Sequence, residues 1–170
     1  MKKTVVAIAA FGYFGACVLL VAGLGVLWHR SEPAPVQPIA FPHTVHAGQL
    51  QMPCTYCHTF VDRSRSAGAP PLEICMGCHR SIATDRGEIR KLTRHFEEKR
   101  PVEWKRVYAL PDFIYFSHKR HVTAGVACAS CHGNVAGMKK VRRVNELLMG
   151  WCLSCHRVRG ASRDCATCHK

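Results

Sequence analysis

A five-residue unit, Cys-x-x-Cys-His, occurs five times in this chain of 170 residues and uses ten of its eleven cysteines. In this spacing, two thiols can add to the vinyl groups of a haem while the adjacent histidine ligates the iron from the proximal side. The sequence therefore predicts five covalently attached haem c groups. The attachment cysteines are Cys54, Cys57, Cys75, Cys78, Cys128, Cys131, Cys152, Cys155, Cys165 and Cys168, and the proximal ligands are His58, His79, His132, His156 and His169.

Other uses of paired cysteines fit this pattern poorly. A structural zinc site takes four cysteine or histidine ligands, so its cysteine pairs would come in even number and would need no histidine after each. A thioredoxin-like dithiol would need one pair at a strand-to-helix turn. Five pairs, each followed at once by histidine, favour haem over both alternatives.

The histidines outside these units match the number of sixth ligands that five irons would need. Six remain, and His29 lies at the end of an apolar segment, where an interfacial role is expected. The other five are predicted distal ligands: His43, His46, His95, His118 and His121. Methionine is also an axial ligand of haem, so four methionines compete with them: Met52, Met76, Met138 and Met149.

Four of the predicted distal histidines belong to two Phe-x-His-x-x-His segments, which begin at Phe41 and Phe116. We expect His43 and His118 to serve the units that begin at Cys54 and Cys128. His46 and His121 would reach other haems of their own half, and His95 the iron that remains. With both axial positions filled, no substrate can bind the iron, which leaves outer-sphere electron transfer and no catalytic residue.

The chain also contains an internal repeat. Segment 41–79 holds one Phe-x-His-x-x-His segment and two haem units, and segment 116–156 has the same content. The fifth unit, 165–169, is appended. We expect residues 43–170 to form a mostly α and irregular domain with a haem-packed core and little or no sheet, because few segments are periodic.

Two helices are nevertheless expected in this domain. Asp85-x-x-Glu88 resembles a capping box, and Ile89, Leu92 and Phe96 form the stripe that follows it, ended by Pro101. A second helix is expected over residues 140–149.

The N-terminal segment is expected to be a membrane anchor, residues 1–30. Thr4 to Trp28 is a run of 25 residues without a charge, about 37 Å long as a helix and able to cross a bilayer. A cleaved signal peptide is the alternative, but its apolar region is normally shorter. Lys2 and Lys3 favour a cytoplasmic N-terminus, which places the haem domain in the periplasm. Residues 31–42 contain four prolines and are expected to be a semi-rigid linker.

The net charge of +13 would suit nucleic-acid binding. Five haems carry up to ten propionate charges, which would reduce that value to about +3. The basic residues are therefore more simply explained as propionate partners and solvated surface, and no nucleic-acid partner is expected.

The chain resembles the pentahaem cytochrome c subunit of alternative complex III, a quinol-oxidising membrane assembly. The resemblance lies in the single anchor, the five haem units, the two Phe-x-His-x-x-His segments and the stretch from Trp104 to His118. It implies a relay of electrons from an iron–sulfur subunit to a monohaem cytochrome or other periplasmic electron carrier. Polytopic quinone-binding membrane subunits would be further partners, and the chain would be no enzyme on its own.

Other functions remain open at this stage. A multihaem subunit of a menaquinone reductase complex would run electrons toward quinone, and sequence gives no direction of flow. A small quinol dehydrogenase, of the kind that feeds periplasmic nitrite or nitrate reductases, normally has four haems. A multihaem enzyme acting on nitrogen or sulfur oxyanions would need a five-coordinate iron.

Overall fold

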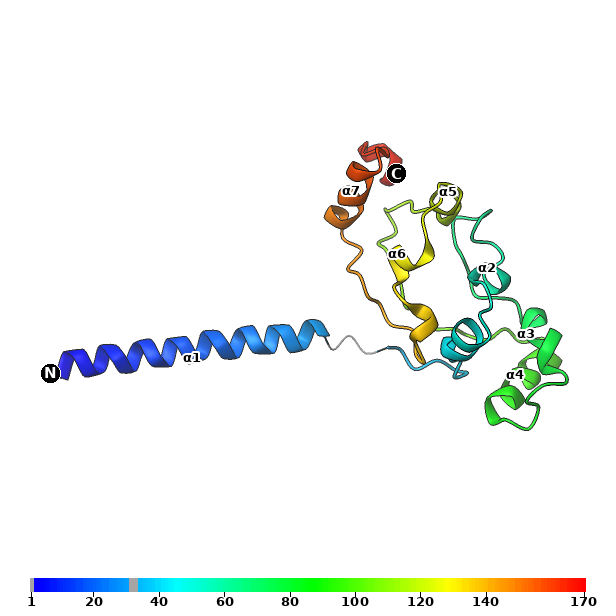
Figure 1. The fold of residues 1–170 in the computed structure, drawn as a ribbon, viewed down its shortest axis with the longest axis horizontal. Coiled ribbons are helices and arrows are strands. Elements are labelled where there is room, and N and C mark those ends of the chain that lie inside the picture. Colours follow the sequence, from blue (N-terminus) through cyan, green and yellow to red (C-terminus); the bar gives the residue numbers. More distant parts are fainter. Residues whose placement is uncertain (1, 31–33) are drawn as a thin grey trace. The chain divides into compact units, whose positions relative to one another are not determined.

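The computed structural model describes residues 2–30 and 34–170, which belong to two separate compact units divided between Pro33 and Ala34 (Figure 1). In the first unit, α1 spans Lys2–Arg30. Its segment Lys3–Leu27 is long and apolar enough to cross a membrane, and none of it is buried within the protein. Large apolar side chains such as Phe11 and Leu19 are exposed along it. The predicted interfacial His29 has a side chain outside the described part of the chain.

The second unit, which we call the haem domain, consists of short helices joined by irregular segments. In chain order these are a π-helix η1 (Thr44–Gln49), α2 (Cys54–Cys57), α3 (Leu72–His79), α4 (Gly87–Glu97), α5 (His118–Thr123), α6 (Cys128–His132), a 3₁₀-helix η2 (Val135–Gly137), α7 (Met149–Val158) and α8 (Cys165–Cys168). The described residues contain no sheet, only an isolated antiparallel bridge between Ile114 and His169. The expected fold class, mostly helical and irregular, is confirmed.

The haem domain has a small core for its length. Its buried hydrophobic side chains among the described residues are Ile39, Val61, Met76, Leu92 and Val102. All except Val61 form one cluster, which lies where α3 packs against α4. So few buried side chains leave most apolar surface of the domain uncovered by protein, as expected for a chain whose core is completed by large apolar cofactors.

Part of the predicted proline-rich linker packs on this core. Ile39 is buried in the cluster, and Gln37 exchanges two hydrogen bonds with the backbone of Lys105, at 2.8 and 2.9 Å. The Ala40 amide donates to the Glu88 carboxylate at 2.6 Å. Residues 37–40 are therefore attached to the haem domain, while residues 31–33 of the predicted linker lie outside the described part of the chain.

The α4 helix forms where its apolar stripe predicts it, but its start differs from the expectation. The residue before the first turn is Arg86, in an extended conformation and without a capping side chain, so the predicted capping box is wrong. Glu88 does not reach back to close the box, because its carboxylate accepts from the Ala40 amide and from Lys91 Nζ instead. A tertiary contact has replaced the local one.

The helix expected over residues 140–149 is wrong. This segment is irregular up to Leu148, and α7 begins at Met149. Tertiary hydrogen bonds hold it in that form: the Tyr108 hydroxyl donates to the Arg142 carbonyl at 3.5 Å and accepts from the Val144 amide at 3.2 Å. Asn145 Nδ2 donates to the carbonyl of Cys131 at 2.9 Å. Local periodicity could not reveal these partners.

Candidate haem sites

Each Cys-x-x-Cys-His unit lies on a short helix, with its histidine within two residues of the helix end. Three of these histidines are held by a hydrogen bond from Nδ1 to a backbone carbonyl: His58 to Gly68 at 2.9 Å, His79 to Ile82 at 3.0 Å and His156 to Ser162 at 2.6 Å. A carbonyl can only accept, so Nδ1 carries the proton. The lone pair is then on Nε2, the arrangement that a metal-ligating histidine requires.

The two Phe-x-His-x-x-His segments have the same local geometry. The first histidine of each meets the phenylalanine edge-on, with ring centroids 4.8 Å apart in both segments. The second lies over the same phenylalanine at 4.5 Å in both. Nδ1 of His46 and His121 faces the carbonyl four residues earlier, at 3.4 and 2.8 Å. Each six-residue segment therefore holds its two imidazoles against one phenylalanine in the same way.

Three of the predicted distal histidines face proximal ones across a gap. Ring centroids are 6.0 Å apart for His46 and His79, 6.3 Å for His118 and His132, and 6.0 Å for His121 and His156. Two metal–nitrogen bonds of about 2 Å each, plus the two ring radii of about 1 Å, require centroids about 6 Å apart for a metal held between two imidazoles. The separations therefore fit an iron between each pair.

The fourth distal candidate, His43, is close to His58. Burial, followed by the neighbouring His58 and His46, lowers the pKa of His43 below its ordinary value. Nδ1 of His43 is buried and has no hydrogen-bond partner among the described residues. The imidazole is thus kept neutral, as an iron ligand must be, beside the first haem unit. Its counterpart in the repeat, His118, donates from Nδ1 to the Arg65 carbonyl at 2.9 Å.

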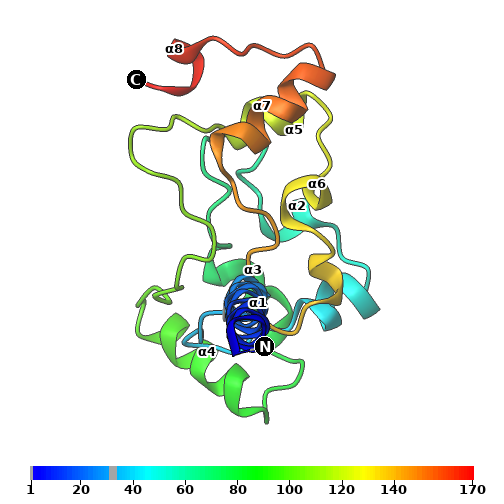
Figure 2. The same ribbon diagram turned by 90° about the vertical axis from the view of Figure 1, so that its left-hand side faces the viewer.

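The five units follow one another in space in a different order from that of the sequence. Along the haem domain, α3 is followed by α2, then α6, α7 and α8, and this order is the same in two perpendicular views (Figures 1 and 2). The second unit of the chain is therefore at one end, and the first unit lies between the second and the third.

Thiol electrostatics agree with that order. Burial raises the pKa of each of four thiols, and a thiol of the neighbouring unit raises it further: Cys57 acts on Cys75, Cys54 on Cys128, Cys155 on Cys131, and Cys168 on Cys152. Such influence weakens with distance, so the interacting thiols lie close together. Each unit is thus next to the one that precedes it in the spatial order.

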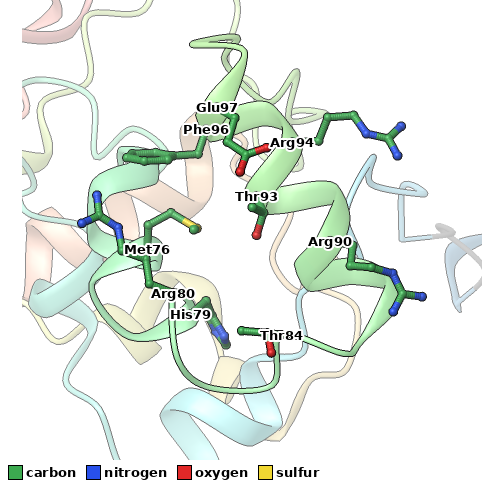
Figure 3. Close-up of a pocket in the computed structure, with 9 residues that line it drawn as sticks. All are labelled: Met76, His79, Arg80, Thr84, Arg90, Thr93, Arg94, Phe96 and Glu97. Atoms are coloured by element: carbon green, nitrogen blue, oxygen red, sulfur yellow. The ribbon is translucent and has the colours of Figure 1, made fainter.

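A cavity of about 540 Å³ lies beside the second unit, between α3 and α4 (Figure 3). Met76 and Thr93 point into it from opposite helices, and the His79 ring lies at its edge. The guanidinium groups of Arg90 and Arg94 extend away from it. The cavity therefore offers space beside this haem unit.

The remaining predicted ligands, His95 and His169, are not brought together. His95 is half-buried on α4 and donates from Nδ1 to the Arg100 carbonyl at 3.2 Å. His169 follows α8, is exposed, and has the Phe113 ring stacked at 5.8 Å. The two helices lie at opposite ends of the haem domain in both views (Figures 1 and 2).

The methionine alternatives and one missed residue complete the site. Met76 is 3% exposed and packs in the core cluster, and Met149 is an exposed residue at the start of α7. Sequence reasoning missed Tyr108, whose ring meets His132 edge-on at 4.6 Å. No sequence signal marks it, because it lies 24 residues before that histidine and outside both repeats.

Comparisons with known proteins agree with the presence of c-type haem units. Residues 114–170, which hold three of the five units, match the family described as cytochrome c7 and related cytochrome c. The chain is also similar to the multihaem cytochrome c subunit of menaquinone reductase from Nitratidesulfovibrio vulgaris. The two are 28% identical over 189 aligned positions, which cover 95% of this chain and 90% of that protein. The haem domain is therefore that of a multihaem c-type cytochrome, an electron-transport protein with a cytochrome c7-like region at its C-terminal end.

Proposed function

We propose that this protein is a membrane-anchored cytochrome whose five c-type haems pass electrons in single file within a quinone-linked membrane complex. The observation that carries the proposal is the spacing of three histidine pairs at 6.0 to 6.3 Å, each pair containing one proximal and one predicted distal ligand. When bound in such pairs, c-type haems supply reversible one-electron transfer without an open iron position.

The chain's own residues would hold four of the haems by two histidines each. His43 would complete the unit at Cys54, and His46 the unit at Cys75. His118 and His121 would do the same for the units at Cys128 and Cys152. Backbone carbonyls fix several of these rings through Nδ1, so that Nε2 is aimed at the metal before it arrives. The protein's role is then to fix the distances between the haems and their orientation, and to exclude solvent from each haem site.

The spatial order of the units supports a linear relay. The rate of electron tunnelling falls steeply with distance. A linear series in which each haem unit lies beside the next therefore favours transfer between neighbouring haems. Electrons would enter or leave at the unit on α3 and at the unit on α8, which are the two ends. The first unit of the chain would pass electrons between the second and the third.

The similarity to a menaquinone reductase subunit favours transfer from a periplasmic electron carrier toward quinone. Flow in the opposite direction, as in alternative complex III, is the second candidate and rests on the connecting stretch that ends at His118. The expected partners of this chain are an iron–sulfur subunit and polytopic quinone-binding subunits. Helix α1 would anchor the chain in the cytoplasmic membrane, with its N-terminus in the cytoplasm and the haem domain in the periplasm.

Ligation is tested on the full-length chain purified in mild detergent with its haems attached. The haem content should be five per chain, and the ferric EPR spectrum should be dominated by low-spin signals. His118→Ala should convert one haem from low spin to high spin, because the His118 ring faces His132 with centroids 6.3 Å apart. Lys119→Ala, at an exposed neighbouring position, is the matched control and should leave the spectrum unchanged. Unchanged low-spin signals in His118→Ala would contradict the proposed pairing.

The direction of electron flow is tested on the complex purified from native membranes, with this chain carrying the purification tag. The haems are first reduced with a limiting amount of dithionite, and the menaquinone analogue menadione is then added. Rapid reoxidation of the haems, with slow haem reduction by menadiol in the converse experiment, would support menaquinone reduction. Rapid reduction by menadiol with no reoxidation by menadione would favour quinol oxidation instead.

A further inference from the structure

We propose that the fifth unit, residues 165–169, holds a haem whose sixth coordination position is open to small exogenous ligands such as carbon monoxide. This inference rests on the proposed attachment of five haems and goes beyond it, because it separates one site in function from the other four.

The first argument is the allocation of the histidines. Four units have a distal candidate: three by ring separations of about 6 Å, and the first by His43, which meets Phe41 with the same geometry as its counterpart His118 meets Phe116. Among residues 34–170 only His95 is then left, and it lies on α4 at the opposite end of the domain from α8 (Figures 1 and 2). The fifth iron therefore receives no second imidazole from the haem domain.

The second argument is what surrounds His169. Its ring stacks on Phe113, with the two planes 23° apart, and its backbone forms the bridge with Ile114. The amide of Tyr115 donates to the Cys168 carbonyl at 2.7 Å. These contacts fix the unit against segment 113–115, which supplies the side chains of a phenylalanine, an isoleucine and a tyrosine and no histidine or methionine. The fifth unit is therefore held in a defined position by contacts with the rest of the haem domain.

The third argument is exposure. His169 is exposed, whereas the other nine predicted ligands are half-buried. The unit is also terminal in the spatial order, with a neighbour on one side only. A site at this end is reachable from solvent, which an exogenous ligand needs. The unit on α3 is the other terminal one, but its predicted ligands His79 and His46 are half-buried.

The charges near the unit favour anionic ligands and do not oppose small neutral ones. A cavity of about 520 Å³ flanks α8 and is lined by Arg65, Arg120 and Lys170, with Asp164 as the acidic member. Arg65 lies over the Tyr115 ring at 4.3 Å, and Lys170 over the same ring at 5.9 Å. Excess positive charge raises the local concentration of anions. Cyanide would therefore be the ferric probe and carbon monoxide the ferrous one.

The test uses the full-length chain in detergent, and its haem content is measured first. Titration of the reduced protein with carbon monoxide should show one ligand bound per chain, and the ferric EPR spectrum should contain a high-spin signal of one haem in five. Cys165→Ala/Cys168→Ala should remove one haem together with all carbon monoxide binding and the high-spin signal. His95→Ala should leave the stoichiometry at one.

Three results would overturn the inference. Five haems with no carbon monoxide binding would show that the fifth iron has a sixth ligand, and gain of binding in His95→Ala or His29→Ala would identify it. Two carbon monoxide molecules per chain in His95→Ala would show that His95 already ligates another iron, which breaks the allocation. A content of four haems would contradict the proposed pentahaem function and the inference together, so the two failures are distinguishable.

Discussion

Replacing Gly48 by alanine should disturb two distal ligands through a backbone clash. Gly48 lies in η1, the π-helix that contains His46 and directly follows His43. A Cβ atom at this position would stand 2.7 Å from the carbonyl oxygen of Ala136 in η2. Ordinary contact begins near 3.4 Å, so η1 and η2 would have to separate by about 0.7 Å. The position of the alanine Cβ is fixed by the backbone and its contact is a backbone carbonyl, so no side-chain rotation can relieve the overlap.

The size of the effect follows from that displacement. Inserting one methyl group into a tight contact typically costs about 1 to 3 kcal/mol. A shift of about 0.7 Å also exceeds the tolerance of about 0.5 Å within which a ligand set keeps its geometry. We therefore expect Gly48→Ala to lower the free energy of unfolding of the haem-loaded chain by that amount. Part of the low-spin signal of the first and second haems should be lost with it.

The assay is guanidinium denaturation followed by Soret absorbance, with EPR of the ferric protein at zero denaturant. Gly150→Ala is the matched control, because no atom lies within 4 Å of its new Cβ and the residue is in α7. It should be neutral or stabilising by up to about 1 kcal/mol, as expected for glycine to alanine in a helix. If Gly48→Ala unfolds at the wild-type midpoint with its low-spin signal intact, the argued contact between η1 and η2 is wrong.

Two further predictions concern the small core and the segment packed on it. Leu92→Ala should destabilise the haem domain by about 2 to 5 kcal/mol in the same denaturation assay, because Leu92 is 5% exposed in the core cluster. Val158→Ala is the control and should have little effect, because this side chain is 87% exposed. Equal unfolding midpoints for the two variants would contradict the role of the core cluster in stability. Hydrogen bonds from Lys91 and, to a lesser extent, from the Ala40 amide lower the pKa of Glu88. The stability that the charged carboxylate contributes is therefore present at neutral pH and is lost as pH falls through that lowered pKa. Glu88→Gln should be less stable than wild type at pH 7, and the difference should shrink in acid; a difference that does not change with pH would refute this cause.

The sequence predicted the parts of the site that depend on local spacing. The attachment units and the Phe-x-His-x-x-His segments are short, so the residues that present an imidazole are neighbours in the chain. The similar geometry around Phe41 and Phe116 follows from that locality. The α4 helix was likewise predictable from its apolar stripe, because one face of it meets the core at Leu92.

Features that depend on contacts between distant segments could not be predicted. The irregular path of residues 140–148 depends on Tyr108, more than 30 residues away, and the start of α4 depends on the amide of Ala40. The spatial order of the haem units is a third case, since the first unit of the chain, at Cys54, lies in space between the second and the third. Nothing in local periodicity encodes such an order.

The small core should make the cellular amount of this protein depend on its haems. Four clustered side chains around Leu92 give little apolar burial to oppose the conformational entropy of the haem domain. A chain exported without its haems would spend most of its time unfolded, and proteases would remove it as they act on any open state. We therefore expect the steady-state amount of this protein to follow the supply of haem and of the attachment machinery, even when its messenger RNA is constant.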